Sequence, residues 1–196
     1  EIDGSVSPRI EKVAQVLNYM GPTLISSHLM ASRWGKLINN ACMSGMSAAC
    51  GATFGEVLDN DTARACLSYL GREVKQCCEA AGYKLPILLH EQSPVTLDIK
   101  DQEMFNANQE MFLTMYSDMR TAKASMLQDL EKGRVTEVGM INGYVCQTGD
   151  QYGIDTPYND KVVEIVSKIE QGKLPLSMEN ITLFDQLDRE YELYHI

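Results

Sequence analysis

The stretch WGKLINN, residues 34–40, places a lysine and, four residues later, an asparagine within a segment of small and apolar residues. In an α-helix, a step of four residues leaves two side chains about 40° apart around the axis and about 6 Å apart along it. The segment therefore predicts a helix on which Lys36, Asn40 and Ser44 form one polar stripe. A cationic donor beside an amide suits binding or protonation of a carbonyl oxygen. Spacing alone favours the simpler interpretation, a surface helix whose lysine extends into water.

Helical signals continue on both sides of this stretch. Ser7 before Pro8 is typical of an N-cap followed by proline at the first helical position, and Gly21-Pro22 predicts the end of that helix. Downstream, the cluster DND at residues 59–61 predicts the start of another helix. The face that this helix is expected to bury consists of Ala63, Leu67, Leu70, Val74 and Cys78.

The rest of the chain is also predicted to be helical. Further helices are expected over approximately residues 28–50, 101–119, 125–132, 136–149 and 157–171, with an amphipathic one after Pro175. Only 1–3 and 85–89 have a strand-like pattern, and the glycine-rich GATFG at 51–55 is predicted to be a loop. The fold class predicted for the chain is therefore all-α.

Composition limits the classes of protein and partner. With 196 residues, 44% of them hydrophobic, the chain is long enough for one substantial core. No apolar run approaches the roughly 18 residues of a membrane helix, and a net charge of −10 argues against a nucleic-acid surface. Six cysteines without a CxxC pair indicate free thiols in a reducing cytoplasm. None of the three histidines lies at ligand spacing from a cysteine, so we expect no metal site.

A second informative stretch is SMLQDLEKGRVTE at residues 125–137, followed by ING at 141–143. Composition alone predicts a helix, a glycine turn and a second helix. Ser125 and Thr136 stand where helix caps are common, and Glu137 would favour the positive end of the second helix. The chain contains no GxGxxG, no GxxxxGK[ST] and no GxSxG motif, so no dinucleotide-binding, phosphate-binding or nucleophile-elbow segment is predicted.

Taken together, WGKLINN, SMLQD, TE at 136–137 and ING resemble the C-terminal domain of the ketopantoate reductase (2-dehydropantoate 2-reductase) family. Their order and spacing match over roughly residues 1–170, and the opening EIDG at 1–4 resembles the segment where that family's N-terminal domain leads into its helical one. The resemblance implies the helical C-terminal domain of a 6-phosphogluconate dehydrogenase-like, ketopantoate reductase-like oxidoreductase.

The resemblance also implies an activity and a set of site residues. Members reduce a 2-oxo acid to a 2-hydroxy acid in pantothenate biosynthesis, with NADPH bound mainly by an N-terminal Rossmann domain. Lys36 matches the catalytic lysine, which would hydrogen-bond the ketone oxygen and supply a proton. Asn40 and Ser125 match substrate-binding positions, and Glu137 matches a glutamate that contacts the cofactor.

Two positions depart from the family pattern. The family usually has a further asparagine four residues after Asn40, where this chain has Ser44, which we retain as a substrate-binding residue. Another asparagine is common where this chain has Phe54, and an apolar ring there removes a polar substrate contact. The identity of the 2-oxo acid therefore stays open.

The domain organisation expected from the resemblance has three parts. Residues 1–6 would be the remnant of an interdomain connection, 7–174 the helical catalytic and substrate domain, and 175–196 a C-terminal helical extension. The Rossmann domain would be missing from this chain, which by itself would be inactive because hydride transfer needs the bound nicotinamide.

Two other interpretations remain open at this stage. A non-catalytic helical dimerisation or interaction module could keep the fold, and Ser44 and Phe54 favour it. The joint retention of four residues argues against it: Lys36, Asn40, Ser125 and Glu137. A reductase of other 2-oxo acids or of imines is the second. Helices rich in methionine and leucine are also compatible with a homodimer.

Overall fold

The helix boundaries follow the capping residues of the sequence. In the computed structural model, which describes residues 1, 3–85 and 97–190, Ser7 caps the first helix by accepting from the Ile10 N–H, and Pro8 opens it. Asn60 and Asp101 cap two later helices by accepting from backbone N–H groups three residues on, at 2.9 and 2.8 Å. Each of these side chains satisfies an N–H that has no partner within its helix.

The described residues contain helices and no strand, which confirms the all-α prediction. The elements are α1 (Pro8–Leu17), α2 (Leu29–Asn39), η1 (Asn40–Ser44), α3 (Gly45–Cys50), α4 (Phe54–Asp59), α5 (Asp61–Ala80), α6 (Gln102–Met115), η2 (Ser117–Met119), α7 (Ser125–Glu131), η3 (Val138–Met140), α8 (Asn142–Tyr152), α9 (Pro157–Glu170), η4 (Met178–Phe184) and α10 (Asp185–Glu190). The strand-like segment at 85–89 lies, apart from Leu85, outside the described residues.

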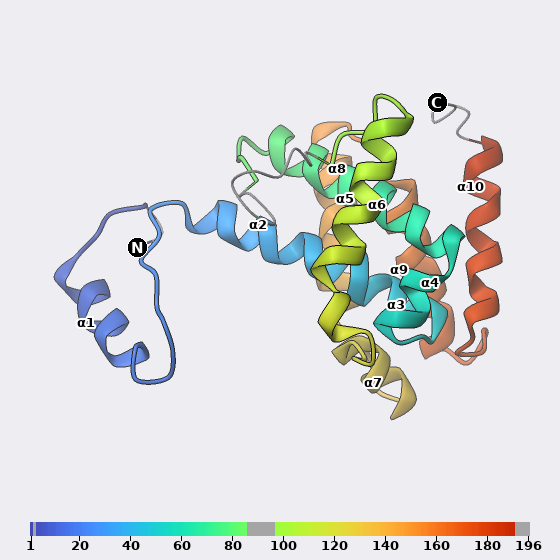
Figure 1. Ribbon diagram of the computed structural model, residues 1–196, viewed down its shortest axis with the longest axis horizontal. Helices are drawn as coiled ribbons and strands as arrows, with labels where there is room; N and C mark the ends of the chain where they lie inside the picture. Colours follow the sequence, from blue (N-terminus) through green and yellow to red (C-terminus); the bar gives the residue numbers. More distant parts are fainter. Residues whose placement is uncertain (2, 86–96, 191–196) are drawn as a thin grey trace.

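The core is built around α5, which contacts α2, η1, α4, α6, α8 and α9 (Figure 1). Every residue of its predicted apolar face is buried, namely Ala63, Leu67, Leu70, Val74 and Cys78. Full burial of a leucine or valine side chain contributes roughly 1.5–3 kcal/mol, so this face accounts for a large part of the stability of the body. One acidic residue of α5, Glu73, is also buried, and the apolar pattern did not predict it.

The GATFG segment is shorter as a loop than predicted. Gly51 ends α3 at a φ of 59°, and α4 already begins at Phe54. Thr53 caps α4, because its hydroxyl accepts from the Glu56 N–H while the Glu56 carboxylate accepts from the Thr53 N–H. Because the segment is rich in glycine, its composition predicted a loop and did not indicate this capping box.

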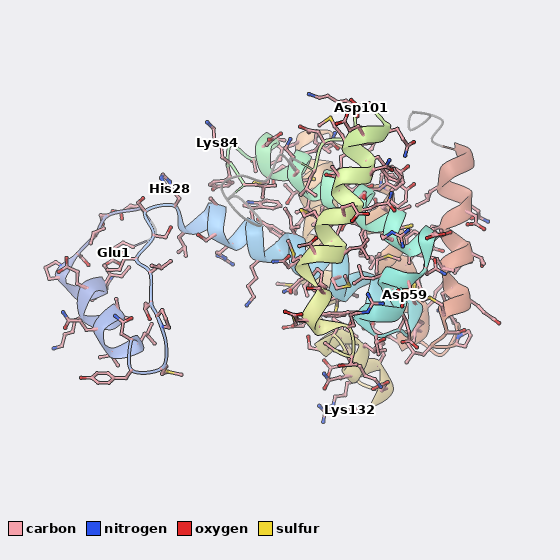
Figure 2. All side chains as sticks on the ribbon, viewed as in Figure 1. Glu1, His28, Asp59, Lys84, Asp101 and Lys132 are labelled. Carbon is pink, nitrogen blue, oxygen red and sulfur yellow. The ribbon has the colours of Figure 1, made fainter. Side chains whose placement is uncertain are left out.

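The N-terminal segment lies apart from the helical body. Figure 1 shows α1 and the chain on either side of it connected to the body through α2, and Figure 2 shows the same separation with the side chains drawn. Among the apolar residues of α1, only Ala14 is buried, whereas Val13, Val16 and Leu17 are exposed. The apolar side of α1 therefore has no partner among the helices of the body.

All six cysteines are free, and five of them are buried in the core. Burial raises the pKa of Cys50 and Cys77 to about 12 because an apolar environment disfavours the thiolate. They therefore pack as small apolar side chains. Among the described helices, none is long and apolar enough to cross a membrane.

Candidate functional site

Lys36 is displayed on α2 by the residues around it. Trp34, Gly35 and Ile38 are buried, and the Trp34 ring lies 5.7 Å from that of Tyr144 on α8, at a 44° tilt. These contacts hold one face of α2 against the body, so the opposite face carries Lys36 into solvent. Its ammonium group makes no hydrogen bond or ion pair with the described part of the chain and is open to a ligand.

The helix does not continue regularly from Lys36 to Ser44. Residues 40–44 form the π-helical turn η1, in which the Gly45 N–H donates to the carbonyl of Asn40, five residues earlier. The side chains of Asn40 and Ser44 are half-buried. Single π-helical turns within α-helices are frequent at functional sites, because they change the direction in which side chains project. The sequence spacing assumed an unbroken α-helix and did not predict this turn.

Ser125 is the first residue of α7, which contacts η1 and α3. Met126 and Leu127 anchor α7 by being almost fully buried, whereas Ser125 itself is exposed. The residue at the N-cap position is Ala124, so the Ser125 side chain is not used as a cap. The hydroxyl of Ser125 therefore stays available beside the elements that carry Asn40 and Ser44.

Glu137 lies at the entry to η3 and is exposed. The residue before it is firmly held: the N–H and hydroxyl of Thr136 each lie 2.7 Å from Oε1 of Glu170, and the same hydroxyl accepts from the Val138 N–H at 3.2 Å. The carbonyl of Glu137 accepts from the N–H groups of two following residues. Its backbone is thus fixed, while its carboxylate has no partner among the residues that the structure describes.

Elements far apart in sequence contact η1, which carries Asn40 and Ser44. Asn142, the first residue of α8, donates from Nδ2 to the Ala41 carbonyl within η1 at 3.0 Å. Glu137 stands five residues before Asn142, and α7 contacts η1. η1 is therefore in contact with α7, which begins at Ser125, and with Asn142, which follows Glu137 by five residues.

Phe54 belongs to the core. It is 7% exposed, and its ring meets that of Tyr116 edge-on, with centroids 5.4 Å apart at 78°. The hydroxyl of Tyr116 in turn donates to Oδ1 of Asn39 at 3.2 Å. An apolar ring at position 54 is thus accommodated by packing between α4 and the end of α6.

A buried polar network was missed by sequence reasoning. Glu73 accepts from the N–H groups of Tyr158 and Asn159 at the start of α9, each at 2.9 Å, and from Nδ2 of Asn159 at 2.7 Å. Oδ1 of Asn159 accepts from Asn142 at 2.9 Å. The only sequence signal for this network is the motif ING, which contains Asn142, a residue to which sequence analysis assigned no role.

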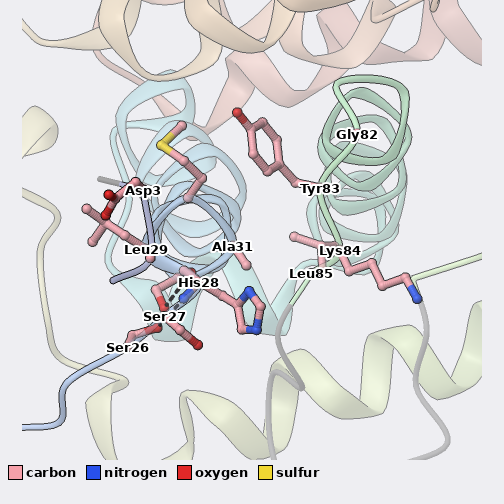
Figure 3. A pocket seen from close by; sticks show the side chains of 13 residues that line it. Asp3, Ser26, Ser27, His28, Leu29, Ala31, Gly82, Tyr83, Lys84 and Leu85 are labelled. Atoms are coloured by element: carbon pink, nitrogen blue, oxygen red, sulfur yellow. Dashed lines mark hydrogen bonds between the residues drawn. The ribbon is translucent and has the colours of Figure 1, made fainter. Parts of the chain in front are cut away.

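A cavity of about 700 Å³ lies elsewhere, between the start of α2 and residues 82–85. Figure 3 shows His28 on one side of it and Tyr83 on the other. It shares no residue with the segment 36–44, and we assign it no part in the chemistry considered below. No group of three histidine, cysteine or acidic side chains suited to a metal occurs within the described ranges.

Comparison with known proteins places this geometry in context. The family model described as "Ketopantoate reductase PanE/ApbA C terminal" matches residues 28–170. The 2-dehydropantoate 2-reductase of Archaeoglobus fulgidus is 30% identical over 173 residues, which cover 88% of this chain and 52% of that protein. The enzyme of the same name from Pyrococcus horikoshii is 26% identical over 151 residues, covering 76% of this chain and 44% of that protein. The chain thus spans about half the length of these curated relatives.

Solved structures share the fold. A PanE/ApbA family ketopantoate reductase from Ralstonia eutropha superposes with a TM-score of 0.67 at 22% identity, over 83% of this chain and 49% of that one. D-mandelate dehydrogenase in a ternary structure with NADH and anilino(oxo)acetate gives a TM-score of 0.67 at 23% identity, over 84% of this chain and 62% of that one. At these identities the likeness establishes the arrangement of the helices and leaves the substrate open.

Proposed function

The chain belongs to the ketopantoate reductase family, and from this premise we propose that it is the substrate-binding part of a reductase that converts a 2-oxo acid into a 2-hydroxy acid. The observation that carries the proposal is Lys36, an exposed ammonium group without a partner among the described residues, on a helix whose other face is anchored by Trp34. A lysine held in this way is free to meet a carbonyl oxygen.

Each site residue receives a role in this proposal. Lys36 donates a hydrogen bond to the ketone oxygen of the substrate and gives it a proton as negative charge develops there. Asn40 and Ser44 hold the polar groups of the 2-oxo acid from η1, and Ser125 does so from α7. Because these groups approach from separate elements, they orient the ketone as well as bind it.

The cofactor is proposed to be NADPH, which supplies the hydride when bound. Glu137 suits contact with it, because an exposed carboxylate without a partner among the described residues accepts hydrogen bonds from hydroxyl groups. The sequence has no GxGxxG segment, so most of the binding would come from a Rossmann domain outside this chain. The coverage of about half of the curated relatives supports such a division, in which this chain by itself is inactive.

The experiment is a panel of 2-oxo acids, ketopantoate included, assayed with NADPH and with NADH on the intact protein that contains this chain. Oxidation of the reduced cofactor with one 2-oxo acid clearly preferred supports the proposal. Binding of neither nicotinamide cofactor would contradict it. The 196-residue chain alone serves as the control and is expected to show no turnover.

A second candidate is a helical interaction module without catalysis, for instance one that forms a homodimer. The exposed apolar side chains of α1, Val13, Val16 and Leu17, favour it, because such a surface commonly meets another protein surface. A structural neighbour from Staphylococcus aureus is described as a dimeric ketopantoate reductase. Titration of the intact protein with NADPH separates the two candidates, since a pure interaction module binds no cofactor.

A further inference from the structure

The carbonyl of Ala41 has an unusual partner. In a regular α-helix it would accept from the N–H of Gly45, four residues later. In η1 that N–H donates instead to the carbonyls of Asn40 and Cys42. Nδ2 of Asn142, a fully buried residue, donates to the Ala41 carbonyl at 3.0 Å. A side chain from α8 thus bonds the carbonyl whose regular α-helical donor, the Gly45 N–H, bonds elsewhere.

Gly45 makes room for this side chain. A Cβ at position 45 would lie 2.9 Å from Oδ1 and 3.0 Å from Nδ2 of Asn142, closer than real Cβ atoms approach. The absence of a side chain at Gly45 therefore lets the amide reach the helix backbone. Oδ1 of Asn142 has no hydrogen-bond partner and is buried, so the residue is held there by its two donated bonds.

The direction of the Asn142 amide is set from α5. Both carboxyl oxygens of Glu73 accept from N–H groups, one of which is Nδ2 of Asn159. Because Nδ2 of Asn159 donates to Glu73, the other side-chain atom, Oδ1, is the one that accepts from Asn142. Asn142 must therefore present Nδ2 to both of its neighbours, because Asn159 and Ala41 each offer an acceptor. Burial disfavours loss of any of these bonds.

We propose that Asn142 is a positioning residue that holds η1 in its π-helical register and thereby sets how Asn40 and Ser44 project relative to Lys36. The claim about Asn40, Ser44 and Lys36 rests on the proposed function, whereas the claim that Asn142 holds the register of η1 concerns only the fold. A π-helical turn adds one residue to a helix, and its loss would rotate the two sides against each other by roughly 100°. All six residues of α3 are buried, so the rotation would fall on α2, which carries Lys36.

A structural experiment on the 196-residue chain tests whether Asn142 holds η1 in its π-helical register. The variant is Asn142→Ala, and the matched control is Asn180→Ala, because buried Asn180 also donates twice from Nδ2, to the carbonyls of Ala49 and Pro175. Through-hydrogen-bond NMR couplings identify the acceptor of the Gly45 N–H. In the wild type and in Asn180→Ala, we expect the carbonyl of Asn40 among the acceptors of this N–H. In Asn142→Ala, we expect the carbonyl of Ala41 in its place.

A second variant keeps the test possible if Asn142→Ala does not fold. In Gly45→Ala/Asn142→Ala, the amide atoms that a Cβ at position 45 would meet at 2.9 and 3.0 Å are gone, and Cγ1 of Val162, at 3.2 Å, has to shift by a few tenths of an ångström. Alanine also favours a regular helix over glycine by about 1 kcal/mol, so this double variant should fold with a regular α-helix across residues 40–45. Retention of the Asn40 acceptor in either Asn142 variant would overturn the proposal.

A kinetic experiment on the intact protein tests whether this register sets how Asn40 and Ser44 project relative to Lys36. If Asn40 and Ser44 are misdirected, Asn142→Ala raises the KM for the 2-oxo acid by about tenfold, with a smaller effect on kcat. Asn180→Ala should stay within about twofold of the wild type in both. Equal effects of the two variants would overturn the positioning role. If the wild type reduces no 2-oxo acid, the proposed function has failed, and the NMR experiment alone then decides whether Asn142 holds the register.

Discussion

Nδ2 of Asn159 lies 2.7 Å from Oε2 of Glu73, although the two residues are 86 positions apart in the sequence. The bond ties the start of α9 to the middle of α5, and it is accompanied by two backbone N–H donors from α9. Glu73 thereby caps α9 from another helix, which a local capping rule does not predict. A buried carboxyl in this position also makes the stability of the fold depend on pH.

Stability should fall as pH rises from about 5 to about 8. Burial raises the pKa of Glu73 from 4.5 to about 8, although the three N–H donors oppose that shift. In this range the folded chain keeps a proton that the unfolded chain has released, so the free energy of unfolding falls by up to about 1.4 kcal/mol per pH unit. Urea denaturation at several pH values measures the slope.

Glu73→Gln should remove most of this slope, since glutamine does not titrate. Glu110→Gln, at an exposed glutamate on α6, is the control and should leave the slope as it is in the wild type. An unchanged slope in Glu73→Gln would assign the pH dependence to other groups.

Lys36→Ala should separate catalysis from stability. Because the Lys36 side chain is exposed and has no partner among the described residues, the free energy of unfolding should change by less than about 0.5 kcal/mol. In the intact protein, kcat for the 2-oxo acid should fall about 100-fold, as expected for loss of a general acid. Lys173→Ala, another exposed lysine, is the control for both measurements. Normal turnover in Lys36→Ala would remove this lysine from the mechanism.

Phe54→Asn, which introduces the residue common in the family at this position, should destabilise the chain. The amide would replace a buried ring that packs against Tyr116, and it would lose both contact area and hydrogen bonds to water. A cost of about 3 kcal/mol follows for a large core side chain. Phe54→Leu keeps the site apolar and should cost less, and urea denaturation compares the two. A stable Phe54→Asn with tighter 2-oxo acid binding would show that position 54 faces the substrate.

Thr136→Val should affect cofactor binding through Glu137. The substitution keeps the shape but removes the hydroxyl that bonds Glu170 and accepts from the Val138 N–H. The free energy of unfolding should fall by about 1–2 kcal/mol, and the KM for NADPH in the intact protein should rise because the neighbouring carboxylate is less well held. Thr136→Ser retains the hydroxyl and should restore both values. Failure of serine to restore the KM would argue that the methyl group matters instead.

Local sequence predicted the helices that depend on their own residues. The starts at Pro8, Asp61 and Gln102 follow from caps within three residues, and the buried face of α5 follows from apolar spacing. The glycine-rich segment 51–55 was the local failure, because Thr53 and Glu56 form a capping box inside what composition predicts to be a loop.

The sequence by itself determined the all-α class, the family and the identity of the polar side chains on residues 36–44, because helical periodicity and caps act over a few residues. Only the tertiary structure decided the π-helical turn and the partners of Glu73. Both depend on side chains about a hundred residues away: Asn142 donates to the Ala41 carbonyl, and Asn159 donates to Glu73. These hydrogen bonds form only when α5, α8 and α9 pack together. A buried donor must find an acceptor wherever the fold supplies one, and spacing along the chain does not reveal which one it will be.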